Sequence, residues 1–95
     1  MSARDLIVRL IATLALVATA ACSQPLPEEG SADARLYVDR CGRCHAVYMP
    51  GMLTSAMWEA MVGRMEGEMK RRGRPLDPVD RERILAYLQR NAGTR

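Results

Sequence analysis

The sequence predicts an all-α fold, a compact domain of three helices. Three segments each begin with a residue suited to cap a helix N-terminus, and each continues with apolar residues at helical spacing. They begin at Ser31, at Thr54 or Ser55, and at Asp77. A chain of 95 residues allows at most one modest domain, which we place at residues 31–95.

Residues 1–21 have the pattern of an export signal peptide. Arg4 and Arg9 give a basic start, and Leu10 to Ala21 is an unbroken run of 12 apolar or small residues. This run is shorter than a typical membrane-spanning segment. We therefore expect an exported protein that resides in the periplasm.

Two kinds of processing fit the end of this run. One is ordinary cleavage after Ala20; the other is lipoprotein processing, in which Cys22 becomes the acylated first residue and anchors the protein to a bacterial membrane. The residues before Cys22 resemble a lipobox, although Thr19 stands where leucine is usual. Residues 22–30 are polar and contain prolines, so we expect a flexible tether.

Charge and composition limit the function. Removal of residues 1–21 takes away Arg4, Arg9 and Asp5 and leaves a formal charge of +2, too mild to favour a nucleic-acid partner. Phenylalanine is absent, and the aromatic residues are Tyr37, Tyr48, Trp58 and Tyr87. The remaining residues, about 74 in number, form a domain whose stability is usually marginal without a disulfide, metal or cofactor. We therefore expect a bound group in the interior.

The first predicted helix begins at Ser31, with Asp33 in its first turn. One face of it leads to a pair of cysteines, because residues at helical spacing continue through Ala34, Tyr37, Val38, Cys41, Cys44 and His45.

The second predicted helix runs from Thr54 or Ser55 to about Lys70. The third opens with Asp77 as N-cap and Pro78 at its first position. Gly93 is a natural stop for the third helix. The predicted buried side of that helix consists of Ile84, Leu85, Tyr87 and Leu88.

Residues 41–45 read Cys-Gly-Arg-Cys-His, which is the signature of covalent haem attachment. Two thiols three positions apart can each add to a vinyl group of one haem, and the adjacent imidazole can bind its iron. We therefore predict one haem c bonded to Cys41 and Cys44, with His45 as an axial ligand.

Three other uses of these residues are less consistent with the sequence. A thioredoxin-like C-x-x-C motif needs a βαβ context. A zinc site needs a second pair of ligands, and Cys22 is the only further cysteine. A disulfide between Cys41 and Cys44 would leave His45 without a role.

The other side of the iron calls for a different residue type, because His45 is the only histidine of the chain. Methionine is the first candidate for the sixth ligand. Met49 is only four residues from His45 and is poorly placed to reach the opposite face. The remaining candidates are Met52, Met57, Met61, Met65 and Met69.

Four of these methionines share one face of the second helix. At about 100° per residue, Met65 lies at the centre of the apolar arc, so we place it first, Met69 second and Met61 third. In the alternative interpretation all of them pack in the core and the iron keeps an open position.

These features resemble a small class I cytochrome c with one haem. Tyr37 stands four residues before Cys41, where that family places an aromatic residue, and Ile84 to Leu88 match its terminal I-x-x-Y-L pattern. The resemblance covers residues from about 31 to 92. It implies that the first and last helices cross in contact and that the middle segment closes a haem cleft.

A closer resemblance is to short single-haem modules in which C-x-x-C-H is followed by a proline and then by a W-x(6)-M helix. Pro50, Trp58 and Met65 match these positions. This similarity also implies Met65 as the axial ligand.

The expected function is single-electron transfer between redox partner proteins. The protein is then an electron carrier rather than an enzyme, either alone or as the haem subunit of a dehydrogenase complex. The alternative is a five-coordinate or weakly six-coordinate haem c protein that binds or senses a small gas. A basic cluster could steer an acidic partner or form a solvated helix end; it consists of Lys70, Arg71, Arg72 and Arg74.

Overall fold

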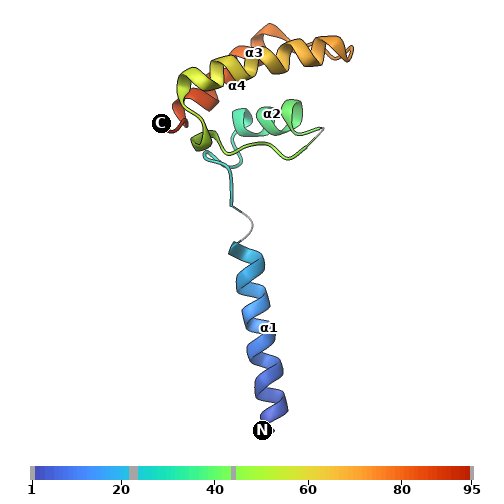
Figure 1. Cartoon of the computed structure of the whole chain (residues 1–95), viewed down its shortest axis with the longest axis vertical. Helices are drawn as coiled ribbons and strands as arrows, with labels where there is room; N and C mark the ends of the chain where they lie inside the picture. Colours follow the sequence, from blue (N-terminus) through green and yellow to red (C-terminus); the bar gives the residue numbers. More distant parts are fainter. Residues whose placement is uncertain (1, 22–23, 44, 95) are drawn as a thin grey trace.

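The computed structural model is all-helical, as the sequence predicts (Figure 1). It describes residues 2–21, 24–43 and 45–94. Within these ranges the only β pairing is an isolated bridge between Thr54 and Gly93. The elements are α1 (Ala3–Ala21), α2 (Ala32–Cys41), the short 3₁₀ helix η1 (Pro50–Met52), α3 (Ser55–Arg71) and α4 (Pro78–Arg90).

The predicted caps start the three helices of the domain. Ser31, Thr54 and Asp77 each accept a hydrogen bond from a backbone N–H in the following turn, at 2.9 to 3.2 Å. Thr54 rather than Ser55 is therefore the cap of α3. Pro78 occupies the first position of α4, where its missing N–H costs nothing.

Two helix ends differ from the sequence prediction. α2 ends at Cys41 and does not continue to His45, because Gly42 leaves the helical conformation and caps the end. A Cβ at Gly42 would lie 2.6 Å from the carbonyl oxygen of Val38, so this tight end needs glycine. α4 ends at Arg90, and Gly93 instead donates its N–H to the oxygen of Leu53 at 2.9 Å.

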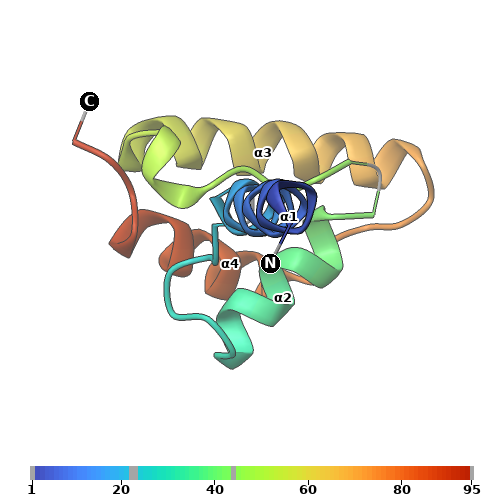
Figure 2. The same cartoon turned by 90° about the horizontal axis from the view of Figure 1, so that it is seen from below.

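α4 packs against both α2 and α3, which confirms the expected contact between the first and last helices of the domain. Figure 2 shows α3 along one side of the domain and α2 and α4 on the other. The core contains apolar residues from all three helices and from the loop before α4. They are Ala34, Tyr37, Trp58, Val62, Leu76, Ile84, Tyr87 and Leu88.

Three aromatic rings form the centre of this core, one from each helix. The Tyr37 ring meets Trp58 edge to face at 6.3 Å and lies 5.8 Å from Tyr87. The polar atoms of the first two also fix the loop after α2. Tyr37 Oη donates to the oxygen of Tyr48 at 2.8 Å, and Trp58 Nε1 donates to that of Pro50 at 2.7 Å.

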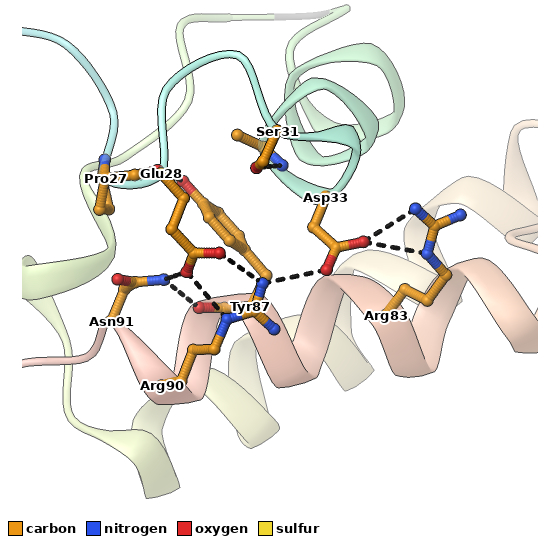
Figure 3. A network of polar contacts seen from close by, with 9 residues as sticks. Pro27, Glu28, Ser31, Asp33, Arg83, Tyr87, Arg90 and Asn91 are labelled. Atoms are coloured by element: carbon orange, nitrogen blue, oxygen red, sulfur yellow. Dashed lines mark hydrogen bonds and ion pairs between the residues drawn. The ribbon is translucent and has the colours of Figure 1, made fainter.

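The segment before α2 contacts the domain as well. Leu26 packs against the core, and Tyr87 Oη donates to the oxygen of Pro27 at 3.0 Å. Arg90 binds both oxygens of the Glu28 carboxylate at 2.8 Å, as Figure 3 shows. The part of the predicted tether from Leu26 onward is therefore held against α4.

Asp33 connects the contact between Glu28 and Arg90 to α2. We call the two carboxylates, Glu28 and Asp33, and the arginines that bind them the junction network. It accepts from Arg90 at 3.0 Å and from Arg83 at 2.8 Å (Figure 3). The hydrogen bonds from Arg90 hold the pKa of Glu28 and of Asp33 below the usual values, with Asn91 and Arg83 adding to the effect at the respective carboxyl.

α1 extends away from the other helices in Figure 1. Among the described residues it takes part in none of the main helix-to-helix contacts. No described helix has the length and apolar character that crossing a bilayer requires. The assignment of residues 1–21 as a signal peptide stays a prediction.

Truncation of the core should be costly. Ile84 is fully buried, so Ile84→Ala should lower the free energy of unfolding by about 2–5 kcal/mol. Val79 lies on the same helix but is 65% exposed, so Val79→Ala should change the free energy of unfolding by less than about 0.5 kcal/mol. Urea unfolding followed by circular dichroism measures both; equal effects would contradict the described core.

The junction carboxylates should make the protein sensitive to acid. Because their pKa values are lower in the folded chain, their stabilisation is complete above their ordinary values of 4.5 and 3.8 and is lost as pH falls through the folded values. The double variant Glu28→Gln, Asp33→Asn should therefore lose less stability between neutral pH and pH 3 than the wild type.

Thermal melting at a series of pH values provides the measurement. Glu59→Gln is the matched control, because Glu59 is exposed and has no ion-pair partner among the described residues. An acid dependence that is the same in the double variant and the wild type would argue against the junction network.

Candidate functional site

The first predicted attachment residue, Cys41, is the last residue of α2. Its side chain is partly buried and packs against the core. Burial raises the pKa of the Cys41 thiol to about 11, so the sulfur is protonated at neutral pH. Cys44 lies outside the described residues.

His45 is exposed in the loop that follows α2. Its Nδ1 lies 2.8 Å from the carbonyl oxygen of Ala46, and a carbonyl can only accept, so Nδ1 is the donor. This bond leaves the lone pair on Nε2 available. A second-sphere bond of this kind is typical of histidines that bind a metal ion.

The donor set fits a covalently attached haem. The fit rests on a core-facing thiol at the end of α2 and an imidazole with its Nε2 available, four residues further along the chain. The loop that carries His45 is fixed at both ends. Before it stands the C-cap of α2, and after it the carbonyl of Tyr48 accepts from Tyr37.

The methionines differ in their surroundings. Met52 and Met57 are 63% and 49% exposed, respectively. Met61 and Met69 are partly buried and pack against the core, whereas Met65 is partly buried but lies outside that packing.

Two cavities adjoin α3, and the methionines that are candidate axial ligands are divided between them. The larger, of about 660 Å³, brings Met69 of α3 together with Arg43 of the attachment motif. The smaller, of about 470 Å³, is lined by residues of α3 alone and contains Met61 and Met65. Met69 is thus the candidate that shares a cavity with the motif.

The cavity beside the motif is lined by apolar, basic and acidic side chains. The sequence singled out Arg72 and Arg74 but not Arg40 and Arg43, which flank Cys41. Arg40 directly precedes the motif and Arg43 lies within it, and this position in the sequence could have identified both residues. The residues that line this cavity are Arg40, Arg43, Met69, Arg72, Arg74, Pro75, Leu76, Asp77 and Asp80.

The proline and tryptophan of the W-x(6)-M resemblance have a structural role. Trp58 is buried, and its Nε1 donates to the oxygen of Pro50, so the two residues tie the start of η1 to α3. That bond fixes the path of the chain between His45 and the methionines.

Comparison with known proteins places this site in a family. No curated protein and no solved structure matches the chain. A family model described as dihaem cytochrome c matches residues 37–95, more than half of the chain and the part that contains the attachment motif. The family implies covalently bound haem c. The chain therefore belongs to the dihaem cytochrome c family, and residues 37–95 form a c-type cytochrome domain.

Proposed function

We propose that this protein is a c-type cytochrome with a single haem, which transfers single electrons between redox partner proteins. The observation that carries the proposal is the placement of Cys41 and His45. Cys41 faces the core at the end of α2, and His45 keeps its Nε2 available through the bond from Nδ1 to Ala46.

The proposal of a single haem rests on the motif. The chain contains one C-x-x-C-H sequence and one histidine, although the family is named for two haems. Cys41 and Cys44 can hold one haem, and His45 can bind one iron. When bound, the haem supplies an iron that takes up and releases one electron.

Met65 is our first candidate for the second axial ligand. Its side chain is partly buried on α3 and is not part of the core packing, unlike Met61 and Met69. A ligand must be free to turn its sulfur toward the iron, whereas a packed methionine fills space. Met69 is the second candidate, because it shares a cavity with Arg43, and Met61 is the third.

One observation favours a second function. The hollow beside Met65 contains no residue of the attachment motif. If no methionine binds the iron, the sixth position is open, and the protein would bind or sense a small gas.

The setting of this function is also part of the proposal. The basic start and apolar run of residues 1–21 support export to the periplasm, and the small residues before Cys22 support a lipid anchor. Cys22 lies outside the described residues. In the periplasm the protein would act as an electron carrier, alone or as a subunit of a dehydrogenase.

Expression in a host with haem-attachment machinery tests the proposal directly. The full chain should give a protein that stays haem-stained on a denaturing gel, with one haem per chain in the pyridine haemochrome assay. The double variant Cys41→Ala, Cys44→Ala should be colourless. Colourless wild-type protein with free thiols would refute the proposal, and two haems per chain would refute the single-haem part.

The axial ligand is tested by two matched variants on the same helix. Met65→Ala should abolish the absorption band of the iron–sulfur bond and lower the midpoint potential, because methionine ligation raises it. Met69→Ala should keep the band and lose only stability. The reverse result would assign Met69, and a band absent from the wild type would favour gas binding.

A further inference from the structure

We propose that Tyr48 is a positioning residue for His45, and that its aromatic ring holds the imidazole at one angle beside the haem. This inference rests on the proposed function, because it concerns the ligand that His45 supplies to the iron. It also goes beyond the C-x-x-C-H motif, because Tyr48 lies three residues after the last residue of that motif.

Tyr48 differs from the other aromatic residues of the chain. Tyr37, Trp58 and Tyr87 are at most 3% exposed and form the centre of the core. Tyr48 is 48% exposed, and it belongs neither to the core cluster nor to the residues packed against that cluster. The packing of the core therefore does not explain this side chain.

The ring of Tyr48 lies close to that of His45. The two centroids are 6.0 Å apart, and the planes of the rings meet at 48°. This separation is within the range of about 4.5 to 7 Å over which aromatic rings attract one another. A tilted ring at this distance restricts rotation of the imidazole about the bond that joins it to Cβ.

The hydrogen bond of His45 does not by itself fix the imidazole relative to the core. Its Nδ1 donates to the oxygen of Ala46, which is the next residue, so donor and acceptor move together with the loop. The imidazole is also exposed. In the part of the chain that the structure describes, Tyr48 provides the one aromatic ring contact of His45.

Tyr48 is itself tied to the core through its backbone. Its carbonyl oxygen accepts from Tyr37 Oη at 2.8 Å, and the ring of Tyr37 packs against Trp58 and Tyr87. The backbone of Tyr48 is therefore held at the place from which its ring meets the imidazole. Through this bond and this ring, the core sets the orientation of the proposed axial ligand.

The contact selects the angle at which the plane of the imidazole meets the haem. Partners outside the set of ligands commonly fix the orientation of a metal-bound histidine. The angle of the imidazole plane influences the energies of the iron d orbitals, and the g-values in the electron paramagnetic resonance spectrum of the ferric protein report those energies. One fixed angle gives one narrow set of g-values, whereas several angles give broadened or additional ones.

The test compares three variants of the haem-loaded full chain by electron paramagnetic resonance. Tyr48→Ala should broaden the g-values or add a second set, because the imidazole can then turn. Tyr48→Phe keeps the ring and should keep the wild-type spectrum. Neither change removes the carbonyl that accepts from Tyr37, so the loop stays attached to the core.

Val79→Ala is the matched control. It also removes an exposed apolar side chain, since Val79 is 65% exposed on α4, and it should leave the spectrum unchanged. A wild-type spectrum in Tyr48→Ala would overturn the inference, and so would an equal change in Val79→Ala. An equal change in Tyr48→Phe would also overturn it, because the hydroxyl rather than the ring would then set the angle. Wild-type protein without haem would instead reject the proposed function, so the two failures are distinguishable.

Discussion

The domain depends on three aromatic side chains that each pack in the core and also hold an irregular segment. Tyr37, Trp58 and Tyr87 come from the three helices, and their rings meet at the centre of a core that has no phenylalanine. Each also donates one hydrogen bond to a backbone carbonyl outside the three α-helices of the domain, at Tyr48, Pro50 and Pro27. A buried Tyr or Trp side chain needs a hydrogen-bond partner for its polar atom. Here these partners lie in the segments before and after α2, so the bonds hold those segments against the core.

This arrangement gives the attachment motif a fixed frame. Cys41 follows Tyr37 by one helical turn, so the residue that anchors the core also sets the position of the thiol. The same tyrosine holds Tyr48, which lies just after His45 in the chain. The motif is thus bounded on both sides by contacts of one side chain.

Local features of the fold were predictable from the sequence, and long-range ones were not. The caps at Ser31 and Asp77 depend on side chains next to the backbone groups they bind, so sequence alone reveals them. The early end of α2 was missed, because cysteine and histidine spacing looked helical across Gly42. The C-x-x-C-H sequence of residues 41–45 can be recognised without a structure, whereas the cavity that joins Arg43 to Met69 depends on how α2 and α3 pack. The choice among the methionines likewise depends on tertiary packing.

The contact between the N-terminal segment and α4 determines where the chain could be cut without loss of the described fold. Pro27 and Glu28 supply the acceptors for Tyr87 and Arg90, so these residues belong to the folded unit although they precede the first helix of the domain. A peptidase that cut after Gly30 would remove both acceptors and expose the end of α4. The two cleavages that the sequence suggests, after Ala20 or just before Cys22, would both leave these acceptors in place.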